Sequence, residues 1–117
     1  MTGQEIKGDN YSVQYNQETV TIQFQGKLAL SGVKDYGPIH DLLYAVVADA
    51  PAQMTLDLRQ LSFLNSSGIS MLSKFVLALR KKEGVQLVVV GSNEMPWQGK
   101  SLRNLKKFLP NLKLEIE

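Results

Sequence analysis

Cysteine is absent from this sequence, and histidine occurs only once, as His40. The absence of cysteine excludes disulfides, thiolate chemistry and cysteine-based metal sites. A single histidine without a cluster of other ligands makes a poor metal site. We therefore expect neither a metal nor a cofactor, and the lack of cysteine fits a reducing compartment.

Long apolar runs are also missing. The first residues, 1–7, are polar and lack the apolar segment of a secretory signal. No apolar run approaches the roughly 20 residues that are needed to span a bilayer. We expect a cytoplasmic protein with no membrane association.

Neither sign of charge is in large excess. The 117 residues include 13 basic and 11 acidic side chains, which gives a formal net charge of +2. That value is too small to indicate nucleic acid as a partner on charge alone. The basic residues do cluster, at 80–82 and 100–107, and a solvated helix face is the simpler explanation of such clusters. The length suits one domain with a single core.

A catalytic apparatus is not visible in the sequence. There is no Gly-x-Ser-x-Gly elbow, and only one histidine is available as a base. The segment from Gly91 to Ser101 ends in Gly-Lys-Ser, but seven residues separate its first glycine from this triplet, a longer spacer than a P-loop has. We expect no enzyme, and a nucleotide- or small-ligand-binding domain that uses this loop and Lys100 stays open as an alternative.

Residue periodicity predicts alternating strands and helices. The predicted strands cover residues 11–15, 19–25, 54–58, 85–90 and 112–116. The predicted helices cover residues 35–50, 66–82 and 98–108. The expected fold class is therefore α/β, with helices packed on a mixed sheet in the order β-β-α-β-α-β-α-β. Residues 85–90 are the most apolar strand and are expected in the centre of the sheet.

The domain boundary is expected near residue 10. Residues 1–10 are polar and carry two glycines, so they are interpreted as a loose N-terminal lead-in. Residues 11–117 then form the single domain.

The most informative stretch is residues 56–72, where an apolar strand leads through Asn-Ser-Ser-Gly into a helix. Asn65 is well placed as the helix N-cap, with Ser66 as an alternative. The first N–H groups of a helix lack intrahelical partners and favour an anion, so a phosphate on Ser66 or Ser67 would be stabilised. A simple capping turn stays open, although it leaves the second serine and the costly Gly68 unexplained.

This stretch resembles the signature of the STAS domain and, more narrowly, that of the bacterial anti-sigma factor antagonists. Those proteins usually carry Asp-Ser-Ser-Gly after an apolar pair, and here Phe63-Leu64 precedes Asn65-Ser66-Ser67-Gly68. The resemblance extends to the element order over residues 11–116. It includes Gly26-Lys27-Leu28, where the family often has Gly-Glu-Leu.

The resemblance implies a phosphorylation-controlled binding protein that performs no chemistry of its own. In that family a serine kinase that doubles as an anti-sigma factor phosphorylates the first serine, and a PP2C-type phosphatase removes the phosphate. The unphosphorylated form binds the kinase and frees its sigma factor, which regulates transcription. By this resemblance, Ser66 is the expected phosphoacceptor. Asn65 is expected to shape the loop, Ser67 to support the cap and Gly68 to allow close docking.

Two positions depart from the family pattern. Asn65 stands where aspartate is usual, and Lys27 stands where an acidic residue is common, which inverts a charge near the expected partner face. These changes indicate a non-standard partner or a divergent branch of the family. A STAS scaffold that is never phosphorylated, and that self-associates as a homodimer, is the other alternative.

Overall fold

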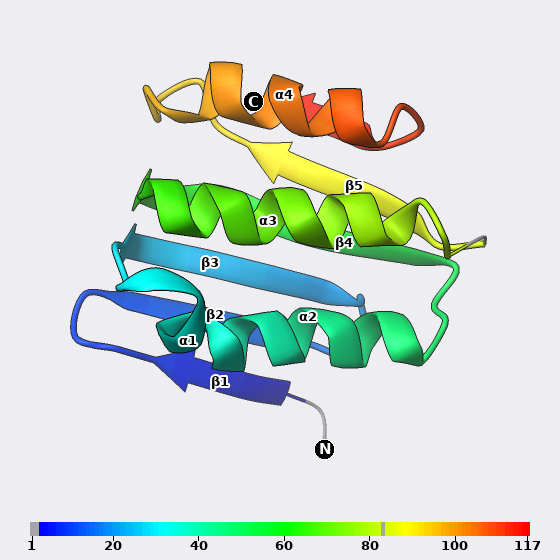
Figure 1. Ribbon diagram of the computed structural model, residues 1–117, viewed down its shortest axis with the longest axis horizontal. Coiled ribbons are helices and arrows are strands. Elements are labelled where there is room, and N and C mark those ends of the chain that lie inside the picture. The colour runs from blue at the N-terminus through cyan, green and yellow to red at the C-terminus, as the bar shows by residue number, and fades with distance from the viewer. Residues whose placement is uncertain (1–2, 83) are drawn as a thin grey trace.

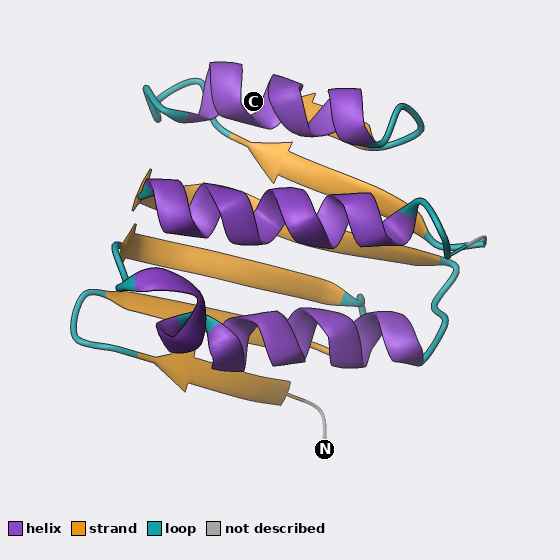
Figure 2. Ribbon diagram, in the orientation of Figure 1, coloured by secondary structure: helices purple, strands orange, loops and turns teal. Residues whose placement is uncertain are grey.

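Helices cover one face of a mixed sheet in the computed structural model, which describes residues 3–82 and 84–117 (Figures 1 and 2). Within those ranges the sheet has six strands: β1 (Gly3–Lys7), β2 (Tyr11–Asn16), β3 (Thr21–Leu28), β4 (Gln53–Leu64), β5 (Gln86–Gly91) and β6 (Lys113–Ile116). The helices are α1 (Gly32–Asp35), α2 (Gly37–Ala48), α3 (Ser66–Leu79) and α4 (Gln98–Phe108).

The strands lie in the sheet in the same order as in the chain, from β1 to β6. The pairs β1–β2 and β2–β3 are antiparallel, and the pairs from β3 to β6 are parallel. Parallel neighbours need crossover connections, and helices make them here. The expected α/β class with a mixed sheet is confirmed. The prediction that residues 85–90 lie at the centre was wrong, because β5 has only the edge strand β6 beyond it, and β3 and β4 occupy the middle.

The N-terminal lead-in requires a correction. Residues 3–7 form the edge strand β1, which pairs along β2 with Ile6 opposite Val13. Ile6 is the only strongly apolar residue of this strand, so alternation gave no signal for it. The strand depends on its ladder of hydrogen bonds with β2. Met1 and Thr2, which belonged to the predicted lead-in, lie outside the described residues.

The first predicted helix, residues 35–50, corresponds to α2, and the short helix α1 that precedes it was not predicted. α1 and α2 meet at Tyr36, directly before the Gly37-Pro38 pair that begins α2. Proline has no N–H to donate to a preceding turn, so it is tolerated only at the start of a helix. The break at this pair places the Tyr36 side chain at the junction, where it is almost fully buried.

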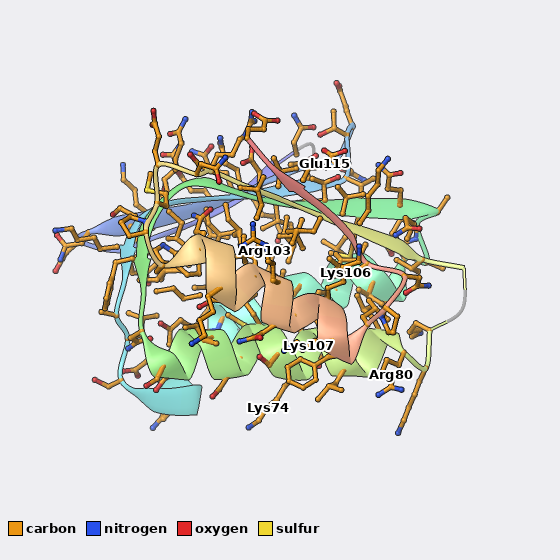
Figure 3. All side chains as sticks on the ribbon, turned by 90° about the horizontal axis from the view of Figure 1, so that it is seen from above. Lys74, Arg80, Arg103, Lys106, Lys107 and Glu115 are labelled. Carbon is orange, nitrogen blue, oxygen red and sulfur yellow. The ribbon has the colours of Figure 1, made fainter. Side chains whose placement is uncertain are left out.

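Strand alternation builds the core between the sheet and its helices. Along β3, Ile22 and Phe24 are buried beneath the helices, while Gln23 and Gln25 lie on the opposite face. Figure 3 shows that no helix covers this opposite face, where side chains project freely from the sheet. The molecule therefore has one helical layer and one open sheet face.

Asp57 lies on the open face of the sheet and is only 7% exposed. Arg59 binds it through two side-chain hydrogen bonds, of 3.0 and 2.8 Å, and through its backbone N–H. Burial alone would raise the pKa of Asp57, but the hydrogen bonds and charge of Arg59 outweigh it and hold that pKa below its usual range. Asp57 is thus the partner of an arginine within its own strand.

Strand β4 is longer than predicted, and its second half is irregular. Gln23 pairs with Asp57 and Gln25 with Gln60. Between these two pairs β4 therefore contains one residue more than β3. A second such step follows between Gly26 and Lys27. Each step is a β-bulge, which leaves backbone groups of the bulged strand without a ladder partner.

Side chains from the start of α4 satisfy these carbonyl groups. The buried Gln98 donates through Nε2 to the carbonyl oxygens of Leu58 (2.6 Å) and Leu61 (3.0 Å). The Trp97 indole N–H donates to the Leu61 carbonyl as well (2.9 Å). Gln98 Oε1 accepts from the Ser92 N–H (2.8 Å). The path of β4 toward residue 65 therefore depends on hydrogen bonds from a segment more than 30 residues further along the chain.

We predict that Gln98→Leu destabilises the fold by about 2–4 kcal/mol, because it leaves the Leu58 carbonyl and the Ser92 N–H buried without partners. Urea denaturation measures the change in the free energy of unfolding. Gln60→Leu makes the same substitution at an exposed position of β4 and should change stability by less than about 0.5 kcal/mol. Equal effects of the two substitutions would contradict this role of Gln98.

Candidate functional site

The candidate site lies where the carboxyl ends of β3 and β4 meet the beginning of α3 (Figure 1). Leu28 pairs with Leu64 and Lys27 with Phe63, so the two strands end together. Asn65 alone connects β4 to α3. In open α/β sheets this edge, outside the carboxyl ends of the strands, is the usual place for a binding site.

Asn65 joins three segments at this edge. Its Oδ1 accepts from the Gly68 N–H (3.0 Å), which confirms the predicted N-cap, and also from the Tyr36 hydroxyl (2.6 Å). Its Nδ2 donates to the Leu30 carbonyl (2.8 Å), and its backbone N–H donates to the Leu28 carbonyl (3.1 Å). One amide side chain thus fixes the start of α3 to the loop after β3 and to the junction of α1 with α2.

The Nδ2 hydrogen bond explains why asparagine suits this position. An ionised aspartate would keep the cap but would place an acceptor oxygen against the Leu30 carbonyl, where a donor is required. The departure from the usual aspartate of the resembling family therefore has a structural basis in this chain.

Tyr36 is part of this arrangement, although the sequence singled it out only as a residue within the predicted helix 35–50. It is 1% exposed, and its hydroxyl donates to Asn65. Burial raises the pKa of Tyr36 above its ordinary value, a hydrogen bond from the Leu30 N–H opposes this rise, and Tyr11 adds to it. The available signal was general: a buried phenol needs a partner for its O–H.

Gly68 has an internal packing role that was not expected from the sequence. It is buried in the first turn of α3. A Cβ atom at this position would lie 2.7 Å from the Tyr36 hydroxyl oxygen and closer still to the Leu64 side chain. Side chains of this chain fill the space beside Gly68, which is reason enough for a glycine there, and the docking role implied by the resemblance stays a prediction.

Ser66 and Ser67 occupy the first turn of α3. Ser66 is exposed and Ser67 is half-buried, and in the described part of the chain neither hydroxyl forms a hydrogen bond. The Gly68 N–H is used by the Asn65 cap, so the N–H groups of residues 66 and 67 remain as the unpaired donors of the helix start. No acidic residue lies in this turn. The turn can thus accept an anion on Ser66 without displacing the cap.

Lys27 and Phe63 flank the turn on the other side of the sheet from the core. They pair with each other across β3 and β4, next to the inward-pointing Leu28 and Leu64. Lys27 is exposed, and Phe63 is 47% exposed. Sequence analysis treated Phe63 only as one of an apolar pair, although strand alternation with a buried Leu64 would have placed it outward. Exposed aromatic side chains are enriched in protein-binding surfaces.

The loop after β5 is arranged differently from a phosphate-binding loop. The N–H groups of residues 92–95 and 98 all donate to acceptors within the chain, including Gln98 Oε1, Ser92 Oγ and the Glu117 carbonyl. A P-loop instead presents such groups to a phosphate. The geometry therefore gives no support to nucleotide binding through Lys100.

Two further surveys concern the described residues alone. Across residues 3–82 and 84–117, no three His, Cys, Asp or Glu side chains gather closely enough to hold a metal ion. None of the helices described there has the length and apolar character needed to cross a bilayer.

Comparison with known proteins identifies related folds. A model of the STAS domain matches residues 10–113. SiaC of Pseudomonas aeruginosa has a similar structure, with a TM-score of 0.73 and 18% identity over 100% of this chain and 98% of that chain. A search of curated proteins finds no matching sequence.

Two further solved structures share the fold. One is the diguanylate cyclase SiaD in complex with its activator SiaC, from P. aeruginosa, with a TM-score of 0.66 and 17% identity over 97% of each chain. The other is an anti-sigma factor antagonist from Mycobacterium paratuberculosis, with a TM-score of 0.59 and 22% identity over 97% of this chain and 84% of that chain.

We predict that Asn65→Asp lowers the free energy of unfolding at pH 7 by about 1–3 kcal/mol, because the Leu30 carbonyl loses its donor while the cap remains. Asn65→Ala removes every side-chain bond and should cost more. Urea denaturation of both variants measures the two losses. An Asn65→Asp protein as stable as the original would contradict the assigned donor role.

A second prediction concerns alkaline pH. Because the folded state raises the pKa of Tyr36, the unfolded state releases this proton first, and the stabilisation is lost as the pH rises above about 10. Tyr36→Phe should cost about 1 kcal/mol at pH 7 through its lost hydrogen bond. It should then lose less stability than the original chain between neutral pH and pH 11. Parallel loss in both proteins would exclude Tyr36 as the titrating group.

Proposed function

The chain belongs to the STAS domain family, and we propose that it is a phosphorylation-controlled regulator that binds a partner protein through the surface around Ser66. The observation that carries the proposal is the exposed Ser66 hydroxyl at the start of α3, beside two unpaired helix N–H groups. The exposed Phe63, three residues earlier in the chain at the end of β4, supplies apolar contact area. The domain performs no chemistry of its own in this proposal.

The switch follows from electrostatics. A phosphate adds about −1.5 to −2 charge at neutral pH. At the start of α3 that charge is stabilised by the helix dipole and by the free N–H groups, and the neutral Asn65 does not repel it. The fold therefore tolerates the modification. Within a docked interface, the same phosphate adds bulk and a charge without a partner, so binding is switched off while the domain stays folded.

The first candidate partner is a serine kinase that doubles as an anti-sigma factor, with a PP2C-type phosphatase restoring the binding form. The Asn-Ser-Ser-Gly turn and the similarity to an anti-sigma factor antagonist support it. Lys27 places a positive charge beside Phe63 on the same surface. In this proposal the partner therefore presents an acidic group to Lys27. A family member with an acidic residue at this position would instead favour a basic group on its partner.

A second candidate partner is an enzyme of the diguanylate cyclase class. The support for this candidate is the structural similarity to SiaC, which extends over almost the full length of both chains. SiaC is the activator of the diguanylate cyclase SiaD. Either partner would bind the same surface, and phosphate on Ser66 would weaken binding of either one. The two candidates therefore differ only in the identity of the partner.

We predict that Ser66→Ala retains partner binding and that Ser66→Asp weakens it at least about tenfold, through charge repulsion in the interface. The measurement is quantitative capture by the tagged chain in its native cell. Thr19→Asp introduces the same charge at an exposed position in the β2–β3 turn, at the other end of β3, and should leave capture unchanged.

The identity of the captured protein distinguishes a kinase from a cyclase. Equal capture by Ser66→Ala and Ser66→Asp would remove the switch and favour a scaffold that is never phosphorylated. Capture of only the same chain by every variant would favour a homodimer.

A further inference from the structure

Two basic clusters that are separate in the sequence lie together in the fold. Residues 66–82 and 98–108 contain eight of the 13 basic side chains and no acidic one. α3 and α4 lie side by side on the sheet and run in the same direction, so their last turns share one end of the molecule (Figure 1). All eight are exposed, and we define the basic helix surface by six of them: Lys74, Arg80, Lys81, Arg103, Lys106 and Lys107. Figure 3 labels each of these six except Lys81.

Within residues 3–82 and 84–117, no ion pair neutralises the charge of this surface. The ion pairs among the described residues involve His40, Arg59 and Lys113, and none uses a member of the basic helix surface. Lys106 and Lys107 lie in the last turn of α4, where positive charge stabilises the helix dipole. That effect does not account for Lys74 or Arg103, which lie further from the helix ends.

Apolar side chains are interleaved with these charges. Leu77 is 38% exposed, and with Lys74 and Lys81 it lines a shallow groove along α3. Phe108, which ends α4, is 36% exposed. Both side chains add apolar contact area to the charged surface. Their presence favours a partner that carries both acidic and apolar groups.

We infer that the basic helix surface is a second docking site and that its occupant is an acidic amphipathic helix of a partner protein. Such a helix would place apolar side chains against Leu77 and Phe108 and carboxylates against the surrounding basic residues. A nucleic-acid backbone would leave the two apolar side chains unused. A membrane would find only these two exposed apolar side chains, a small area for interfacial binding.

The docking site is separate from the Ser66 surface. α3 rises about 1.5 Å per residue, so Leu77 lies about 16 Å along the helix from Ser66. A phosphate on Ser66 is therefore beyond the Debye length of about 8 Å at physiological ionic strength. The chain can hold an acidic helix whatever the state of its phosphorylation switch.

The test uses a synthetic helical peptide with leucines along one face and glutamates on either side, and fluorescence anisotropy measures its binding. Lys81→Glu combined with Lys107→Glu should weaken binding at least about tenfold, and Leu77→Ala should weaken it severalfold. Lys7→Glu combined with Lys34→Glu changes the net charge equally at exposed sites on β1 and α1 and should have little effect. Ser66→Asp should leave peptide binding unchanged. The test of this docking site is therefore independent of whether the proposed Ser66 switch is correct.

Three results would overturn the inference. The first is an equal loss of binding in the Lys7 and Lys34 control, which would leave only net charge as the cause. The second is equal binding of a peptide with the same composition whose leucines are spread around the helix. The third concerns membranes. If the chain sediments with phosphatidylglycerol vesicles at physiological salt, and the variant with both Lys81→Glu and Lys107→Glu does not, the surface is a membrane site.

Discussion

The arrangement of the candidate site depends on the side chain of Asn65. Its amide is both an acceptor for the first turn of α3 and for Tyr36, and a donor to the loop after β3. These partners come from three separate segments of the chain, so the position of Ser66 is set by the tertiary structure and not only by a local cap. In the proposed switch, these hydrogen bonds keep the turn in place when Ser66 gains the charge of a phosphate.

The one-sided architecture divides the molecule into surfaces of different chemistry. Because all the described helices cover the same sheet face, the opposite face is left open, and Lys27 and Phe63 are exposed on it. The same layer places α3 beside α4 and brings two basic segments together. One helix therefore offers an anion-accepting start and a basic, partly apolar flank. In the two proposals, a domain of 117 residues presents one binding surface that phosphate on Ser66 controls and a second that is independent of it.

Sequence predicted the features that arise from local physics. The helix 98–108 and the Asn65 cap were both confirmed, since periodicity and capping act within a few residues. Features that depend on distant partners were missed. The bulges of β4 rely on Gln98 and Trp97, and the need for glycine at position 68 comes from Tyr36 and Leu64. No pattern within residues 56–72 reveals these partners, because they lie elsewhere in the chain or become neighbours only on folding.

The central claim is that Ser66 carries the regulatory phosphate, and phosphate occupancy measured by mass spectrometry on the chain from its native cell tests it most directly. Trypsin should release residues 60–74 as one peptide that contains both Ser66 and Ser67, and fragment ions then distinguish them. The account predicts phosphate on Ser66 in part of the population, at a level that changes with growth conditions. A well-covered peptide that stays unmodified in every condition, or phosphate only on another residue, would contradict it.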